Sequence, residues 1–538
     1  MRTAMLPGPD DTAKPRARQA AGLTGGQEKL RHLGRREHEI ISDFRATLLP
    51  AFLPVLPQAT IAARYVAADQ IEAAGGDWFD AIPLADGDVA FIVGDVVGHG
   101  LAASAAMAQL RAVLNELLLA ESSPAAALAR VDRFAARSTA LQAATVAVVV
   151  LAPSSGQMQY ATCGHPAPLK IGRDGATRYL PATGSGPLGV GSKPVVETDI
   201  LEPGELLLLY SDGLVQRPGQ PPATSLAELA SVAASAARGS ASRIDPTASA
   251  PERVCRLTAE LLRRGGYADD VTTLAVQRLG TTLPSLHLEV PAEVASVRVI
   301  RRALDEWLAR LEPRPDDRDD LQIAVVEIVT NAIQHAYISK HPGSIHFDAA
   351  LRADGCLECA VADFGRWRAP DPNASERGNG LMVAEQLVDR LQITHPAQSE
   401  GVPANDPTTV VTLVRRLTRL ATLDTDDHAE VLTVLDSTPF AIDIQLDGRV
   451  ACAWVNGPVD LSTVDQFLRG LTTACRGGTL SLIVDLSGVS YLASDGVSAL
   501  YQVARQVQRH GKTLELRAQN GSQAQGVLNI VGLPYKAA

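Results

Sequence analysis

The chain has 538 residues, of which 46% are hydrophobic and 20% are charged, and these values predict about three domains with ordinary apolar cores. The net charge of −11 and the aromatic content of 4% argue against general nucleic-acid binding, which needs a basic surface. No apolar run approaches the roughly 18 residues of a membrane span, and the first residues lack the apolar segment of a signal peptide. The six cysteines suggest no disulfide framework. A cytoplasmic location is therefore expected.

Residues 1–35 are expected to form a flexible tail, and a charged segment with a helical pattern follows. Its RREHEII stretch superficially resembles the phospho-acceptor box of histidine kinases, with His38 as the acceptor. The proline that usually follows that box is absent. We therefore favour a solvent-facing His38 on a helix that leads into the next domain.

Four aspartates lie in short motifs beside strand-like runs: Asp77 in GGDWFD, Asp95 in GDVVGHG, Asp212 in YSDGL and Asp269 in ADDVTT. Carboxylates at strand ends can converge on one edge of a sheet, and all-oxygen ligand sets suit hard cations such as magnesium or manganese. Two such ions can clamp a phosphate and generate hydroxide between them. Each Asp-Gly or Gly-Asp pair alone would be an ordinary turn, but four in this order favour a metal site.

These motifs, together with ISDFRATLLPAFLP (41–54) and ARYVAA (63–68), resemble the SpoIIE-type branch of the PPM metal-dependent serine/threonine phosphatases. The resemblance implies that residues 36–280 form a β-sandwich flanked by helices, which removes phosphate from phosphoserine or phosphothreonine by in-line attack of a metal-bound hydroxide. It implies two divalent cations, manganese or magnesium, with Asp95 bridging them and Asp77 beside it as the catalytic carboxylates. The remaining implied ligands are the Val96 carbonyl, Asp212 and Asp269, with Asp80 and Asp270 as supporting carboxylates.

Two positions depart from this family. Eukaryotic members carry a histidine where this chain has Val97, and His99 nearby is not assigned as a general acid. Gln216 stands where glutamate is usual, at a position that is not a metal ligand. The Ala-rich segments 101–120 and 124–136 are predicted helices of this domain.

The second region covers residues 286–417 after a linker near 280–285. Its segment DDLQIAVVEIVTNAIQHAY (319–337) is a predicted helix that places Glu327, Asn331 and His335 on one face. Further along, VADFGRW puts an aspartate at a strand end, and RGNGLMVAEQLVD is a Gly-rich turn that opens a helix and offers N–H groups to phosphate. PTTVVTLVRRL (407–417) is a predicted closing strand.

This set resembles the GHKL ATP-binding fold, an α/β sandwich, in its branch of anti-sigma-factor serine kinases. The resemblance implies a Mg-ATP site in which Asn331 holds magnesium and Glu327 acts as the base or orients water. The other implied ATP contacts are Asp363 to the adenine amino group, Gly365 beside the base, Gly378 and Gly380 on phosphate, and Thr409 on the adenine side. Arg366 and Trp367 replace a further glycine of the family pattern, so a degenerate domain that does not hydrolyse ATP is an alternative.

A polar acidic linker is expected at 418–435, and an α/β pattern of strands and helices at 436–538. DLSGVSYLASDGVSAL (485–500) resembles the STAS fold of anti-sigma-factor antagonists, which implies phosphorylation of Ser494. The family shows Asp-Ser-Ser/Thr-Gly, whereas this chain has Ala493 before and Asp495 after the serine. The alternative is that Ser494 only caps the following helix.

The chain is thus expected to have a multidomain α/β and α+β fold. Its three domains together supply the components of a partner switch, in which phosphorylation decides which proteins bind one another. The implied function is a phosphatase that regulates a sigma factor, with a fused serine-kinase module and a phosphorylatable antagonist module. Its implied partners are a sigma factor and a phosphorylated STAS antagonist in its own or a separate chain, with no nucleic acid, no membrane and a possible homodimer. The alternative is a scaffold that senses nucleotide or phosphorylation and sequesters the sigma factor without kinase turnover.

Overall fold

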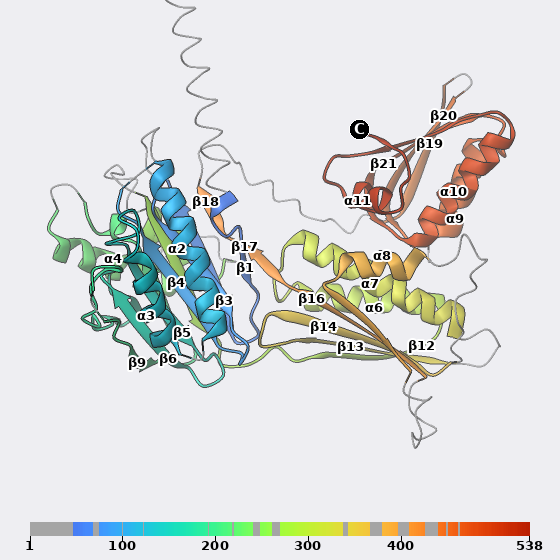
Figure 1. The fold of residues 1–538 in the computed structure, drawn as a ribbon. Coiled ribbons are helices and arrows are strands. Elements are labelled where there is room, and N and C mark those ends of the chain that lie inside the picture. Colours follow the sequence, from blue (N-terminus) through green and yellow to red (C-terminus); the bar gives the residue numbers. More distant parts are fainter. Residues whose placement is uncertain are drawn as a thin grey trace, which may run out of the picture.

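The computed structural model describes the chain in fourteen segments: residues 47–67, 75–98, 100–121, 123–191, 193–217, 220–239, 248–260, 270–336, 343–365, 379–395, 408–424, 439–447, 450–460 and 463–537. These residues form three folded bodies in chain order (Figure 1), which confirms the multidomain α/β and α+β fold class. Several predictions lie outside the described residues: the tail 1–35, His38, His99, Asp269 and Gly378. None of the described helices has the length and apolar character that a bilayer crossing requires.

The first body contains two β-sheets packed face to face. One sheet has the antiparallel order β3 (Trp78–Pro83), β4 (Val89–Asp95), β5 (Thr145–Leu151), β6 (Gln157–Cys163), β9 (Glu197–Ile200). The other has the order β18 (Thr422–Asp424), β2 (Ala59–Val66), β11 (Val271–Arg278), β10 (Leu206–Tyr210), β7 (Leu169–Ile171), β8 (Thr177–Tyr179). Strand β5 reads TVAVVVL and is buried along nearly its whole length, because it is covered on both faces.

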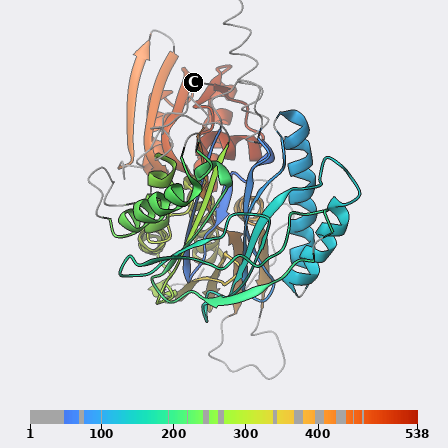
Figure 2. The same cartoon turned by 90° about the vertical axis from the view of Figure 1, so that its left-hand side faces the viewer.

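Helices cover the outer face of each sheet (Figures 1 and 2). Helices α2 (Leu101–Ala120) and α3 (Pro124–Ala135) pack on the first sheet, and α4 (Pro222–Ala237) and α5 (Ala250–Glu260) pack on the second. The structure therefore confirms both predicted helices, α2 with its expected bounds and α3 within one residue at its end. Proline at the first position of α3 suits a helix start because it has no N–H to leave unpaired.

The second body is a five-stranded antiparallel sheet with three helices on one face (Figure 1). The strand order is β12 (Leu286–Pro291), β13 (Ser344–Leu351), β14 (Cys356–Asp363), β16 (Thr409–Arg416), β15 (Arg390–Thr394). The helices are α6 (Val294–Leu308), α7 (Pro315–Asn331) and α8 (Asn379–Leu387). The predicted helix at 319–337 begins earlier, at Pro315, and its α-helical part ends at Asn331, where the wider turn η3 (Ala332–Ala336) follows.

The third body has the sheet order β19 (Ala441–Asp447), β20 (Val450–Val459), β21 (Ser481–Leu492), β22 (Leu514–Ala518), β23 (Lys536–Ala537). Strands β19 and β20 form an antiparallel hairpin, and the remaining neighbours are parallel. Helices α9 (Val464–Ala474), α10 (Ser494–Arg509) and α11 (Gln523–Ile530) complete the body, whose core residues come from all three helices and the sheet.

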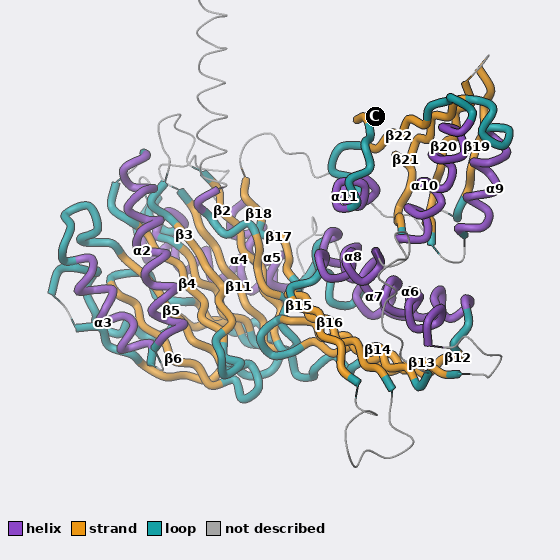
Figure 3. Tube along the Cα trace, turned by 45° about the vertical axis from the view of Figure 1, so that its right-hand side comes forward, coloured by secondary structure: helices purple, strands orange, loops and turns teal. Residues whose placement is uncertain are grey.

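The chain returns to the first body after it has completed the second (Figure 3). Strand β17 (Thr418–Leu420) pairs antiparallel with β1 (Phe52–Pro54), and β18 pairs parallel with β2 at the edge of the second sheet. The side chains of Ala421 and Leu423 pack on the core of the first body. The beginning of the expected linker at 418–435 is therefore a structural clasp between the first two bodies.

Candidate functional site

The acidic motifs of the first body meet where its two sheets come together. Asp77 directly precedes β3, Asp95 ends β4, and these two strands are neighbours in one sheet. Asp212 follows β10 in the short turn η1 (Asp212–Leu214), and Asp270 directly precedes β11 in the other sheet. The Thr272 hydroxyl donates to Asp77 Oδ2 at 2.9 Å and so joins the two sheets at this place.

Two glycines allow the backbone to approach these groups closely. A Cβ at Gly76 would stand 2.1 Å from the Val96 carbonyl oxygen, and one at Gly75 would stand 1.2 Å from Asp270 Oδ2. The Val96 N–H also donates to the Gly76 carbonyl at 3.1 Å. The GGDWFD motif therefore needs glycine at both positions, because a side chain there would collide with the Val96 carbonyl, a predicted metal ligand, or with the Asp270 carboxylate.

Asp77 has the electrostatics of a group that needs a cation. It is 4% exposed, and burial raises its pKa well above the usual value. The negative charges of Asp95 and Asp270 raise the pKa of Asp77 further, while hydrogen bonds from Ser211 and Thr272 oppose the rise. Carboxylates that are buried within reach of one another repel, and a divalent cation with oxygen preference would relieve that repulsion. The donor set therefore fits a hard divalent metal.

The other predicted acidic residues differ in their surroundings. Asp270 is buried and accepts a hydrogen bond of 2.7 Å from the Tyr65 hydroxyl, and half-buried Asp212 accepts one of 2.7 Å from Gln216. Asp269 lies outside the described residues; within those that are described, no three Asp, Glu, His or Cys side chains are close enough to form a complete metal-binding group.

The side chain of Asp80 binds to residues of helix α2. Its two oxygens accept hydrogen bonds from Arg111 at 2.7 and 2.9 Å, and Asn115 donates to it at 3.0 Å. Such a two-pronged arginine contact fixes both partners in one geometry. Asp80 thus connects α2 to β3 at a position three residues after Asp77.

The second body brings together three residues predicted to handle the phosphate end of a nucleotide. Glu327 lies in α7 with 2% exposure, and Asn331 is the last residue of that helix. A Cβ at Gly380, in the first turn of α8, would stand 2.4 Å from Glu327 Oε2 and 3.4 Å from Asn331 Nδ2. Gly378 is outside the described residues. The Gly-rich segment is therefore brought against the predicted base and magnesium ligand.

The residues predicted to contact adenine form a second group in this body. Asp363 at the end of β14 stands opposite Thr409 at the start of β16. The Gly365 N–H donates to Asp363 Oδ1 at 3.1 Å. Burial raises the pKa of Asp363, and the hydrogen bonds from Gly365 and Thr409 oppose the rise. This buried carboxyl is pre-oriented by backbone and hydroxyl donors, as recognition of an amino group requires.

Ser494 begins α10, and Ala493 is the N-cap residue of that helix. Ser494 therefore stands at the first helical position, one residue after the N-cap position that the structural alternative gave it. Tyr491 and Ala493 belong to the buried cluster of the second body, together with residues of α7 and α8. The Arg301 Nη1 atom of α6 donates to Asp460 Oδ2 at 2.8 Å across the same contact. The start of α10 is therefore held against the body that carries Glu327 and Gly380.

Sequence reasoning did not single out Tyr65, Ser211 and Thr272 as site residues. All three lie inside quoted motifs, ARYVAA, YSDGL and ADDVTT, but their hydroxyls gave no signal of the carboxylates that they contact. The contact of Tyr65 with Asp270 joins residues 205 positions apart. These residues could have been identified only if the alternation of side-chain direction along each strand had been used to place the hydroxyls on the side of the carboxylates.

Three family models match the chain in order: Stage II sporulation protein E (SpoIIE) at residues 85–279, Histidine kinase-like ATPase domain at 290–432, and STAS domain at 441–534. The Serine-protein kinase RsbW of Bacillus velezensis is 31% identical over 130 residues, which are 21% of this chain and 81% of the relative. The Anti-sigma F factor of Heyndrickxia coagulans is 28% identical over 125 residues, which are 21% of this chain and 85% of the relative.

The crystal structure of the RsbU and RsbW domains of Rv1364c from Mycobacterium tuberculosis is also similar, with 40% identity and a TM-score of 0.61. The similarity covers 71% of this chain and 99% of that one. Phosphatases and ATPases of these families use a divalent metal and ATP. The chain therefore belongs to the family of SpoIIE-type PPM serine/threonine phosphatases that are fused to an RsbW-like anti-sigma serine-kinase domain and a STAS domain.

Proposed function

We propose that this protein is a partner switch in which one chain both adds and removes the phosphate on its own STAS serine and thereby controls a sigma factor. The observation that carries the proposal is the contact between the STAS and kinase-like domains. Two STAS residues buried in this contact, Tyr491 and Ala493, lie three positions and one position before Ser494, and α8 on the other side carries Gly380 beside Glu327. A tether that joins the kinase-like domain to its docked substrate raises the effective concentration of the serine.

In the phosphatase domain, Asp77, Asp95, the Val96 carbonyl, Asp212 and Asp269 would hold two cations, manganese or magnesium. When bound, these cations neutralise phosphoryl charge and lower the pKa of a coordinated water. The chain's own part is to keep the ligands in place. The Gly75–Gly76 pair admits the close backbone approach, Thr272 and Ser211 orient Asp77, and Tyr65 orients Asp270.

In the kinase-like domain, Asn331 would hold the magnesium of Mg-ATP, and buried Glu327 would accept the proton of the attacking serine hydroxyl or orient it. Gly378 and Gly380 would cradle phosphate with their N–H groups. Asp363, with Gly365 and Thr409, would bind the adenine side. The unphosphorylated STAS domain would compete with a sigma factor for the kinase-like domain, and phosphorylation of Ser494 would end that competition. We further propose a cytoplasmic location and a homodimer as the working form.

The test uses the full chain with Asp95→Asn, which blocks dephosphorylation and lets any phosphate accumulate. After incubation with Mg-ATP, intact-mass and peptide analysis should find one phosphate on Ser494, and the double variant with Ser494→Ala should acquire none. The rate should not change on dilution if the transfer is within one chain. Addition of wild-type protein with manganese should remove the phosphate.

A second candidate is a scaffold that senses nucleotide and sequesters the sigma factor without kinase turnover. The replacement of a family glycine by Arg366 and Trp367, and the changed neighbours of Ser494, favour it. In that case Asp95→Asn protein binds ATP but stays unphosphorylated, while partner binding is unchanged. That outcome would refute the self-phosphorylating switch.

A further inference from the structure

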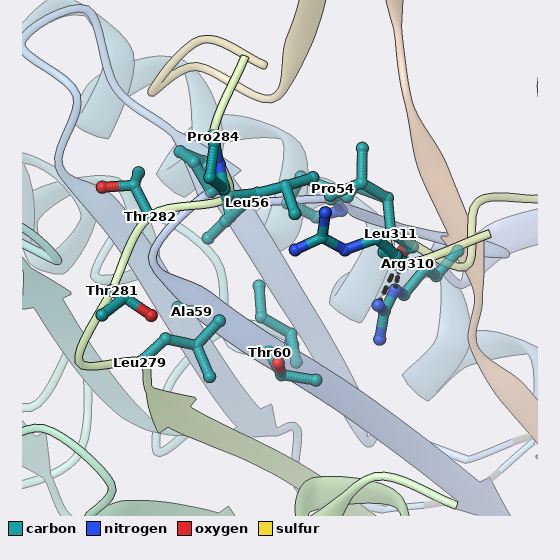
Figure 4. A pocket seen from close by; sticks show the side chains of 15 residues that line it. Pro54, Leu56, Ala59, Thr60, Leu279, Thr281, Thr282, Pro284, Arg310 and Leu311 are labelled. Atoms are coloured by element: carbon teal, nitrogen blue, oxygen red, sulfur yellow. Dashed lines mark hydrogen bonds between the residues drawn. The ribbon is translucent and has the colours of Figure 1, made fainter. Parts of the chain in front are cut away.

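A cavity of about 520 Å³ lies where the phosphatase domain, the interdomain linker and the kinase-like domain meet (Figure 4). This volume is in the range of roughly 300–1,000 Å³ that is usual for small-molecule sites. Its walls come from the segment 54–61, the linker 279–284, the α6–α7 turn at Arg310 and Leu311, and Arg419 of β17. No residue of the two proposed catalytic sites lines it.

The cavity lies in a seam that fixes one domain on the other. The Val55 N–H donates to the Leu417 carbonyl at 3.1 Å, and Val55 itself belongs to the core of the kinase-like domain. The neighbouring Leu56 belongs to the core of the phosphatase domain. The Trp307 indole donates to the Pro284 carbonyl at 2.8 Å and holds the linker on α6. A ligand in this cavity would therefore contact both domains at once.

Most of the lining is aliphatic, formed by prolines, leucines, isoleucine and alanine. The cationic groups are Arg310 and Arg419. The Arg419 Nε and Nη2 atoms donate to the Leu311 carbonyl at 3.2 and 2.7 Å (dashed lines in Figure 4). Within the residues that the structure describes, its buried Nη1 atom has no acceptor, and its Nη2 atom also forms an ion pair with Glu312 at 3.5 Å.

Arg310 is exposed, and within the described part of the chain no ion pair or side-chain hydrogen bond of this arginine occurs. A buried N–H without an acceptor is costly, and a guanidinium binds a carboxylate through parallel, charge-assisted hydrogen bonds. The cavity thus combines an aliphatic wall with an unmet donor and a second cation. Its chemistry is complementary to an amphiphilic anion.

We propose that this cavity binds a small monocarboxylate with an aliphatic body, whose carboxylate contacts Arg419 and Arg310 while its chain lies against Leu56, Ile61 and Leu279. The bound ligand would bridge the phosphatase and kinase-like domains at their clasp. This site is independent of the proposed catalytic chemistry, because binding needs neither metal nor ATP.

The test is isothermal titration calorimetry of the full chain with hexanoate as the probe and hexanol as the uncharged comparison. Hexanoate should bind measurably, and hexanol should bind at least tenfold more weakly, since it cannot supply the charge-assisted contact. Arg310→Gln should weaken hexanoate binding several-fold, and Thr282→Trp should abolish it by filling the mouth of the cavity. Arg302→Gln, in the preceding helix α6 and outside the cavity, is the matched control and should bind as wild type does.

Arg419→Met removes the buried donor, but it also removes the bonds to Leu311, so its thermal unfolding is measured first. If Arg419→Met unfolds at a lower temperature than wild type, the test of the cavity rests on Arg310→Gln and Thr282→Trp, because both of these side chains are exposed. The proposal is overturned if hexanoate does not bind, if hexanol binds equally well, or if both variants bind hexanoate as wild type does. None of these outcomes depends on phosphatase or kinase activity, so they leave the proposed function to its own test.

Discussion

One charge pair with a buried aspartate crosses the contact between the kinase-like and STAS domains, and its removal should favour undocking of the STAS domain. Arg301 Nη1 lies 2.8 Å from Asp460 Oδ2, with side-chain exposures of 22% and 1%. The backbone carbonyl of Asp460 accepts from the Val464 N–H at 2.7 Å, so the aspartate also fixes the turn that begins α9. Arg301→Ala leaves the Asp460 carboxylate buried without its guanidinium.

Truncation of one partner of a buried interfacial charge pair costs about 2–5 kcal/mol. Because Arg301 is about one fifth exposed, the lower part of that range, about 2–3 kcal/mol, is the better estimate for this pair. The loss falls on the docked state alone, because water solvates Asp460 again once the domains separate. At about 1.4 kcal/mol per factor of ten, the docking equilibrium should shift roughly 30- to 150-fold toward the open state.

Hydrogen–deuterium exchange of the full chain measures this shift directly. Arg301→Ala should speed exchange in the segment around Tyr491 and Ala493 and in α8, whereas exchange in the phosphatase sheets should stay unchanged. Arg302→Ala is the matched control, because its pair with Glu306 has exposures of 82% and 66% and such surface pairs contribute little. The double variant Arg301→Ala with Asp460→Asn should recover part of the protection, since no charge is left buried.

Equal exchange in Arg301→Ala and wild type would refute this reasoning, as would an equal effect of Arg302→Ala. In either case the apolar contacts of Tyr491 and Ala493 alone would have to hold the domains together.

Three further predictions concern the phosphatase domain. Gly76→Ala should lower phosphatase activity about 100-fold without unfolding the protein, because its Cβ would displace the Val96 carbonyl from 2.1 Å; circular dichroism checks the fold and release of phosphate from phospho-Ser494 protein checks the rate. Tyr65→Phe should raise the manganese concentration needed for half-maximal activity about 10- to 100-fold, because the buried Asp270 loses its 2.7 Å donor; an unchanged manganese titration would contradict that role. Burial lowers the pKa of His165 from 6.5 to about 3, so the unfolded protein takes up a proton at this residue below pH 6.5. The stability that this group contributes is therefore complete above pH 6.5 and falls progressively toward pH 3. Urea unfolding at pH 5.5 should show roughly 1 kcal/mol less stability than at pH 7.5 from this residue, and His165→Asn should reduce that difference by the same amount.

Local patterns in the sequence were enough for much of the fold. The helix at Leu101–Ala120 was predicted with its bounds, because an Ala-rich stretch follows a Gly-rich turn and has its buried residues, from Ala103 to Leu118, at helical spacing. The strand-end placement of Asp77, Asp95 and Asp212 also followed from the apolar runs beside them. For α7 the pattern was right, but the change to a wider turn after Asn331 depends on packing that periodicity does not record.

The sequence by itself determined which chemistry each domain carries, because metal-binding carboxylates, glycine turns and a helix-opening serine are encoded in short contiguous motifs. Only the tertiary structure decided how these motifs are supported and coupled. Strands β17 and β18 have three residues each, and such short segments become strands only because β1 and β2 offer free edges for pairing. Likewise, the contact of Arg301 with Asp460 joins positions 159 apart, and no local signal marks it, because its energy comes from burial that arises only once the two domains meet.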